Sequence, residues 1–223
     1  MTETGNFWDA EFSKGRYVES APIGFVDEIV AAAFAAGIDH GLYVGCGNGR
    51  NYRPLVAAGL DLIGLDVSPV AIQQLTARMP ERASRLVTGD LSALPAGETY
   101  PLVVAIQVLH HGDREQSHRL LADTVARVAP GGMLAIGIET VGTDVYERHE
   151  VLERAEDGSY TIRYLESSGE LVTHFRTVRG VHLELAAAGL VPQMLMQPRS
   201  AWRTPPERGQ TLELEGIYRR PMT

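Results

Sequence analysis

The chain has 223 residues, of which 44% are hydrophobic and 22% charged, enough apolar sequence for one full core in a globular domain. Its formal net charge of −8 disfavours a nucleic-acid partner, because nucleic-acid binding draws on Lys and Arg. No apolar run approaches the roughly 20 residues that span a bilayer, and no basic and apolar leader opens the sequence, so we expect no membrane partner. The single cysteine excludes an internal disulfide, and we therefore expect a cytoplasmic location.

From Ile38 onward, short β-branched runs alternate with stretches of helical apolar spacing, the pattern of βαβ units around a mostly parallel sheet. The sequence therefore predicts an α/β fold. Five parallel strands, each bounded by Gly, Pro or Asp, are expected at residues 42–44, 62–65, 85–87, 102–107 and 133–138. Helices are expected between them at residues 52–58, 69–78 and 115–128, the middle one starting from Ser68 as N-cap and Pro69.

After the fifth strand the pattern changes. Residues 160–166 and 171–177 predict a β-hairpin around Ser167-Ser168-Gly169-Glu170, an insertion that we expect to flank the active site. A helix at residues 181–188 ends at Gly189, and strands follow at 193–196 and 212–219. We interpret 1–223 as one domain, with an N-terminal lid and first helix (1–37), a ligand-binding core (38–139), the insertion (140–180) and a C-terminal helix and strands (181–223).

The turn after the first strand is Gly45-Cys46-Gly47-Asn48-Gly49, where glycines let the backbone pass close to a ligand. A dinucleotide fingerprint needs its third glycine one place later, where Arg50 stands, and the Gly-Lys-Ser/Thr of a Walker phosphate loop is absent. Cys46 is either a small residue that fits the turn or a thiolate, which needs a nearby base or positive charge.

Two acids end the next two strands. Asp66 lies at the distance from the glycine turn expected of a carboxylate that binds ribose hydroxyls, with a turn or helix cap as the alternative. Asp90 supplies a second carboxylate at the same edge of the sheet, where open α/β folds bind ligands and where it can accept from an adenine amino group. Together with the turn, the two acids predict an adenosine site.

These motifs resemble, in order, those of class I S-adenosylmethionine-dependent methyltransferases. The resemblance spans about residues 41–138 and, more loosely, the whole chain. It is carried by Gly45 to Gly49, Gly64-Leu65-Asp66-Val67-Ser68, Gly89-Asp90-Leu91, Gln107-Val108-Leu109-His110-His111 and Ala129-Pro130-Gly131-Gly132.

The resemblance implies a Rossmann-like fold with a seven-stranded sheet, helices on both faces and an antiparallel last strand. It also implies a set of cofactor contacts. By that resemblance, Gly45 and Gly47, with Cys46 in the same turn, contact the methionine part, and Gln107 contacts the methionine end. By the same resemblance, Asp66 binds the ribose, Val67 and Leu91 contact the adenine faces, and Asp90 accepts from the adenine amino group. One position departs from the family, because Tyr43 stands where an acid usually precedes the first glycine. Thiol, thiopurine and halide methyltransferases share that absence and often an early aromatic-acid pair like Trp8-Asp9; the quinone-biosynthesis branch is the other alternative.

Methyl transfer is an in-line displacement at a sulfonium, so the enzyme mainly aligns the reactants and excludes water. The aromatic segment from Phe7 to Tyr17 predicts a lid, with Tyr17 facing the sulfonium cation or else packing against the first helix. His110 or His111 is a candidate general base, the alternative being packing under the sheet or against the following turn. A metal held by these histidines with Asp113 and His118 is a lesser alternative, and we expect none.

The leading hypothesis is an enzyme that methylates a small-molecule acceptor, acting alone or as a homodimer. Three alternatives stay open: a nucleic-acid or protein methyltransferase that acts with a partner, a non-catalytic protein that binds the cofactor, and a nicotinamide dehydrogenase. The missing third glycine counts against the last, and the acidic charge counts against nucleic acid.

Overall fold

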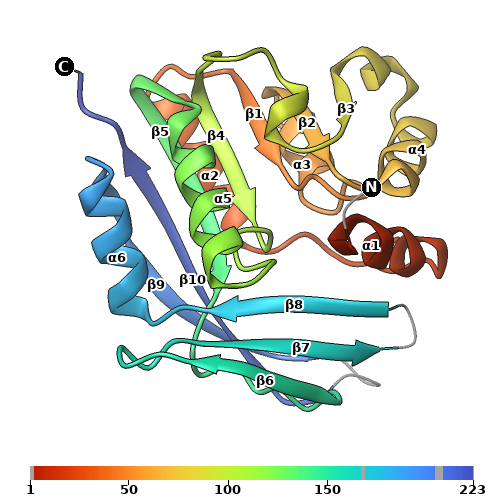
Figure 1. Cartoon of the computed structure of the whole chain (residues 1–223). Coiled ribbons are helices and arrows are strands. Elements are labelled where there is room, and N and C mark those ends of the chain that lie inside the picture. The colour runs from red at the N-terminus through yellow and green to blue at the C-terminus, as the bar shows by residue number, and fades with distance from the viewer. Residues whose placement is uncertain (1–2, 167–168, 204–207, 223) are drawn as a thin grey trace.

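The computed structural model describes residues 3–166, 169–203 and 208–222. Its main sheet has seven strands in the order β3-β2-β1-β4-β5-β10-β9 (Figure 1). The first five in the chain are parallel, while β10 is antiparallel to both β5 and β9. The strands are β1 (His40–Val44), β2 (Asp61–Asp66), β3 (Leu86–Thr88), β4 (Tyr100–Ile106), β5 (Val128–Glu139), β9 (Val191–Trp202) and β10 (Gln210–Arg219). The predicted α/β fold with a seven-stranded, mostly parallel sheet is confirmed.

Helices cover both faces of this sheet. One face carries α2 (Phe25–Ala35), α3 (Tyr52–Ala57) and α4 (Pro69–Arg78), and the other carries α5 (Arg114–Ala126) and α6 (Val178–Ala187). The central strands are buried on both faces because helices cover each side of the sheet. Strand β4 therefore consists almost entirely of apolar residues. Each helix contributes an apolar stripe to one of two cores on either side of the sheet.

Caps fix where the helices near the ligand edge begin. The Ser68 side chain accepts from the backbone amide of Ala71 and Pro69 holds the first helical position, so α4 starts as predicted. At α5, Asp113 and Gln116 form a reciprocal capping box, so this helix begins one residue earlier than predicted. It also ends earlier, at Ala126, because β5 already starts at Val128.

The insertion forms a separate antiparallel sheet of three strands, β6 (His149–Arg154), β7 (Tyr160–Glu166) and β8 (Gly169–Phe175). The predicted hairpin corresponds to β7 and β8, and the predicted turn residues Ser167 and Ser168 lie outside the described residues. The sequence analysis missed β6. All six of its residues are exposed, so it lacks the alternation of apolar and polar residues that marks a half-buried strand.

The small sheet lies across the carboxyl ends of β4 and β5 (Figure 1). On β8, the amide of His174 donates to the carbonyl of His110, in the loop after β4, at 2.8 Å. The amide of Val141, just after β5, donates to the carbonyl of Arg176, the residue that follows β8, at 2.9 Å. Helix α1 (Glu3–Ser13) packs against β8 and α4 at the same edge. The ligand edge of the sheet is therefore covered by two elements that are not part of the βαβ core.

Several strands differ from the prediction at their ends, and β5 begins at Val128, five residues before the predicted start. Strand β9 extends to Trp202, well past the predicted residues 193–196, because it pairs with β10 along almost its whole length. Strand β4 stops at Ile106, and Gln107 leaves it with a left-handed backbone. Among the described residues, no helix is long and apolar enough to cross a membrane.

Candidate active site

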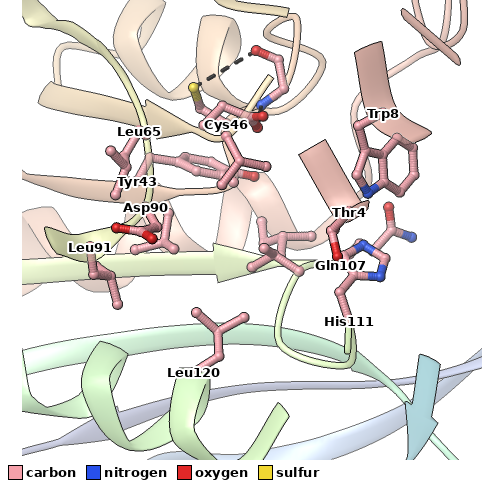
Figure 2. Close-up of a pocket in the computed structure, with 18 of the residues that line it drawn as sticks. Thr4, Trp8, Tyr43, Cys46, Leu65, Asp90, Leu91, Gln107, His111 and Leu120 are labelled. Atoms are coloured by element: carbon pink, nitrogen blue, oxygen red, sulfur yellow. Dashed lines mark hydrogen bonds between the residues drawn. The ribbon is translucent and has the colours of Figure 1, made fainter. Parts of the chain in front are cut away.

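A cavity of about 550 Å³ opens at the carboxyl edge of the sheet. Its walls come from the glycine turn after β1, the ends of β2 and β4, helix α1 and one side of α5. Figure 2 shows Trp8, Gln107 and His111 toward one end of the cavity and Asp90 and Leu91 toward the other. The volume lies within the roughly 300 to 1,000 Å³ typical of small-ligand pockets. The structure thus brings the predicted motifs of four separate loops to one cavity.

The glycine turn adopts backbone conformations that other residues disfavour. Gly45 and Gly47 have φ values of 71° and 55°. A Cβ added to Gly45 would lie only 2.8 Å from the Cβ of Val108, in the loop after β4. The two loops therefore approach so closely that only glycine fits at this position. The amide of Gly45 donates to the carbonyl of Leu65 at 2.8 Å, which ties the turn to the end of β2. The turn is therefore held open toward the ligand by its neighbours on both sides.

Asp66 lines the cavity and also holds the turn. Its Oδ2 accepts from the backbone amide of Gly47 at 2.7 Å, and its Oδ1 accepts from the amide of Ser68 at 2.9 Å. The side chain is 8% exposed, and burial raises the pKa of its carboxyl group, while the bonds to Ser68 and Gly47 oppose that shift. The structure thus realises the turn-capping alternative for Asp66 and leaves its position at the cavity compatible with ribose binding.

The same wall also contains Tyr43 and Cys46, both buried and both in the cavity lining. Burial raises the pKa of the Tyr43 hydroxyl and raises that of the Cys46 thiol well above its ordinary value. Both groups are therefore neutral near pH 7. This favours the interpretation of Cys46 as a small turn residue rather than a thiolate.

The predicted adenine residues lie around the far end of the cavity. Val67 and Leu91 line it, and Leu91 is buried. Asp90 is exposed there and caps a short 3-10 turn, because its Oδ1 accepts from the amide of Ser92 at 2.9 Å. This hydrogen bonding lowers the pKa of Asp90, which stays ionised and able to accept from an N–H donor.

Helix α1 closes one side of the cavity with Thr4, Trp8 and Phe12. The helix is anchored to α4, because the carboxylate of Asp9 accepts from the Ser68 hydroxyl and from the amide of Val70. The two residues of the aromatic-acid pair therefore have different roles: Trp8 lines the cavity, and Asp9 holds α1 against the start of α4.

Tyr17 follows α1 with a φ of 62° and lines the cavity. Two guanidinium groups lie over its ring, that of Arg16 at 5.1 Å and that of Arg50 at 5.2 Å from the ring centroid. Arg50 comes directly after the glycine turn, so this stack connects the N-terminal segment to the turn. The structure places Tyr17 at the cavity as the lid prediction requires, with its faces packed against cations.

The two candidate histidines point to different places. His111 lines the cavity and stacks near Trp8, with 5.3 Å between ring centroids. His110 is only 4% exposed and does not line the cavity; burial lowers its pKa well below the ordinary value. Burial lowers the pKa of His111 to about 4, so both imidazoles are neutral near pH 7. The structure thus brings His111 to the site and leaves His110 packed beneath it.

Gln107 lines the cavity at the end predicted for the methionine part, and its backbone has a φ of 56°. Its amide nitrogen Nε2 donates to Oε1 of Glu213, which lies on β10 and is 8% exposed. Glu139, at the end of β5, is the register partner of Glu213. Sequence reasoning missed both acids, because they come from strands far along the chain and carry no local motif.

Further missed residues come from α5, where Gln116, Leu120 and Asp123 line the cavity at helical spacing. That spacing was a usable signal, but it does not by itself tell which side of the sheet the helix covers. Within the described residues, no three His, Cys, Asp or Glu side chains converge as a metal site. His118 instead pairs with Glu184, its Nδ1 lying 2.9 Å from Oε2.

Comparison with known proteins identifies the class. Residues 42–132 match the family model of a methyltransferase domain. A segment of 97 residues is 27% identical to the ubiquinone biosynthesis O-methyltransferase of Rickettsia conorii; it covers 43% of this chain and 33% of that enzyme, so the match spans about a third of the relative's length.

Solved structures agree over most of the chain. An S-adenosylmethionine-dependent methyltransferase from Clostridium acetobutylicum superimposes with a TM-score of 0.63 at 12% identity, covering 92% of this chain and 94% of that one. The sugar N-methyltransferase KedS8 from a Streptoalloteichus species gives a TM-score of 0.62 at 19% identity, with 94% and 91% covered.

The family model thus identifies a methyltransferase domain within the chain, and the solved structures show that most of the chain shares the fold of S-adenosylmethionine-dependent methyltransferases. Residues 42–132 match that domain, and the cofactor that the sequence motifs predict, S-adenosylmethionine, is the one named for the structure from Clostridium acetobutylicum.

Proposed function

We propose that this enzyme transfers the methyl group of S-adenosylmethionine to a small-molecule acceptor. The observation that carries the proposal is the cavity itself, in which the glycine turn, Asp66, Asp90 and the end of β4 line one space beneath the aromatic side of α1. This space lies at the carboxyl edge of a parallel sheet, where α/β folds bind ligands. Helix α1 lines it, and β8 of the insertion pairs with His111 at its edge, an arrangement that suits a compact acceptor better than a polymer.

In the proposed binding mode, the adenosine part lies between Asp66 and Asp90, with its base against Val67 and Leu91. The methionine part follows Gly45, Gly47 and Cys46 toward Gln107. The sulfonium is then near the end of the cavity that Tyr17 and Trp8 close, where the aromatic ring of Trp8 favours a cation.

The chemistry asks little of the protein. The acceptor's lone pair displaces the sulfide in line, so the enzyme contributes by aligning the two reactants and excluding water. With a pKa of about 4, the His111 imidazole holds no proton near pH 7 and is a weak base. We therefore propose that His111 accepts a hydrogen bond from the acceptor and orients it, and that His110 supports it from below without touching substrate.

Two further observations support a small acceptor. The net charge of −8 opposes a polyphosphate substrate. KedS8, named as a sugar N-methyltransferase, shares the fold over 94% of this chain. We propose in addition that residues 1–223 act as one catalytic unit in the cytoplasm.

Isothermal titration calorimetry with S-adenosylmethionine and S-adenosylhomocysteine tests the first step. We expect one saturable site for both. The second step is tested by turnover of labelled cofactor with a panel of small amines, alcohols, thiols and sugars, set against RNA and a protein extract. Absence of binding at millimolar cofactor would overturn the proposal, and methyl transfer confined to RNA or protein would overturn the acceptor class.

A further inference from the structure

Gln107 is held in an unusual conformation at the cavity. Among the described residues, only Tyr17 and Gln107 have a positive φ without being glycine, a conformation that a Cβ disfavours. Its backbone amide donates to the carbonyl of Gly137 at 2.7 Å, which clamps this backbone against β5. The clamp turns the side chain to a place where it both lines the cavity and reaches β10.

The partner of Gln107 fixes which way its amide faces. Nε2 of Gln107 donates to Oε1 of Glu213. Burial raises the pKa of this carboxyl group, and the bond from Gln107 opposes that rise because it favours the carboxylate, which only accepts hydrogen bonds. The carbonyl arm of the amide is then directed away from Glu213, and Gln107 itself is one of the residues that line the cavity. The buried acid thus decides that Gln107 offers the ligand an acceptor.

The Gln107–Glu213 pair brings a carboxylate close to the end of the cavity beside Gln107. Three carboxylates line the cavity: Asp66 is bonded to the amides of the turn and of Ser68, Asp90 to Ser92, and Asp123 is exposed on α5. Glu213 stands behind Gln107 instead, and a hydrogen bond to a carboxylate polarises the amide toward a more negative carbonyl oxygen. A polarised carbonyl at this place matches a cationic N–H donor.

We propose that Glu213 is a positioning residue, which holds Oε1 of Gln107 toward the cavity to accept a hydrogen bond from the ammonium group in the methionine part of S-adenosylmethionine. This inference rests on the proposed function, because it places the methionine part beside Gln107. It also accounts for a methyltransferase that has Tyr43 in place of the acid at the end of β1: the compensating carboxylate comes from β10 and acts through an amide.

The test compares two ligands. S-adenosylhomocysteine carries the ammonium group, and 5′-methylthioadenosine keeps the nucleoside but lacks the amino-acid part. In E213Q the charge is lost and the two amides can pair in either orientation, so Oε1 of Gln107 is no longer fixed. We expect S-adenosylhomocysteine to bind roughly tenfold more weakly, since one charge-assisted contact is affected, and 5′-methylthioadenosine to bind as in the wild type.

A matched control and a reversed pair sharpen the result. Glu215 is also buried, lies two residues further on β10 and pairs with Arg199, so E215Q should leave both affinities unchanged. In the double variant Q107E/E213Q the amide at 213 donates to a carboxylate at 107, which restores a fixed acceptor at the cavity. We expect it to recover most of the affinity for S-adenosylhomocysteine that E213Q loses.

Four outcomes of these measurements are distinguishable. An equal loss for both ligands in E213Q would show a merely structural role and overturn the inference, and so would unchanged binding of both. A loss confined to S-adenosylhomocysteine and recovered by the reversed pair supports it. If the wild type binds neither ligand, the proposed function itself fails, so the two failures are distinguishable.

Discussion

The carboxylate of Asp66 and the backbone amide of Gly47 are 2.7 Å apart, so the acid at the end of β2 directly holds the turn that follows β1. A second bond from the amide of Ser68 connects the same carboxylate to the start of α4. The residue that the family motif assigns to the ribose is therefore already part of the protein's own scaffold.

This double role makes Asp66→Ala informative. The substitution leaves two buried amides without their acceptor, which costs about 1–3 kcal/mol for each unsatisfied group, and it also removes the proposed ribose contact. We expect a lower thermal midpoint without cofactor and an affinity for S-adenosylmethionine reduced by at least tenfold. Thermal unfolding and calorimetry measure the two effects. If the affinity is unchanged, Asp66 serves the turn alone.

A second prediction concerns Gly45, where φ is 71° and a Cβ meets Val108 at 2.8 Å. Gly45→Ala should push apart the turn and the loop after β4, abolishing cofactor binding and lowering stability. Gly97→Ala is the matched control, because its φ of 73° carries the same backbone cost while nothing lies within 4 Å of its Cβ. Equal losses in the two variants would mean that the backbone conformation, and not the contact with Val108, is what matters.

The parts of the site that the sequence predicts are those encoded by short spacings. Gly45 to Gly49, Asp66 and Asp90 each follow a strand of the parallel sheet, and the carboxyl ends of such strands meet at one edge. Spacing along the chain therefore implies proximity in the fold, and the structure brings all three motifs to the cavity.

Two features of the site could not be predicted from the sequence: which of two adjacent side chains faces the ligand, and which residues far apart in the chain come into contact. His110 and His111 are adjacent, so no pattern tells which of the two faces the ligand, and only the packing of β8 against this loop decides it. Gln107 meets Glu213 across 106 positions, through the antiparallel register of β5 and β10. Strand β6 was missed for another reason, since an exposed edge strand shows no apolar period.

A third prediction addresses how the insertion is attached. Arg176, only 1% exposed, donates to the carbonyl of Leu109 at 3.1 Å and to the hydroxyl of Ser117 at 2.7 Å, and it pairs with Glu184 at 3.0 Å. Arg176→Met should cost about 3 kcal/mol, the low end for a broken buried ion pair because Glu184 keeps contact with water.

The control for Arg176 comes from the same small sheet. Arg163 on β7 pairs with Glu150 and Glu170 at 3.3 and 3.2 Å, and all three side chains are partly or largely exposed. Arg163→Met should therefore cost less than about 1 kcal/mol. Urea unfolding followed by circular dichroism measures both variants. Similar losses at the two positions would contradict the role of Arg176 as the anchor of the insertion.

The last prediction follows from Glu139, the register partner of Glu213 at the end of β5. Burial, and then the neighbouring Glu213, raise the pKa of its carboxyl group from the ordinary value of 4.5 to about 7. The folded protein therefore holds this proton more tightly than the unfolded chain does. Between pH 4.5 and 7 the unfolded chain has already lost the proton, so this group makes stability fall as the pH rises through that window.

Glu139→Gln removes the carboxylate and keeps its shape, so the variant should unfold at a higher temperature than the wild type at pH 8. The difference should shrink below pH 7 and be small by pH 4.5, where the carboxyl group is protonated in the folded protein and in about half of the unfolded chains. A gain of about 1 kcal/mol corresponds to roughly 2–4 °C in a protein of this size. Thermal scans from pH 4.5 to 8 measure it, and a gain that is the same at every pH would show that burial of the carboxylate is not its cause.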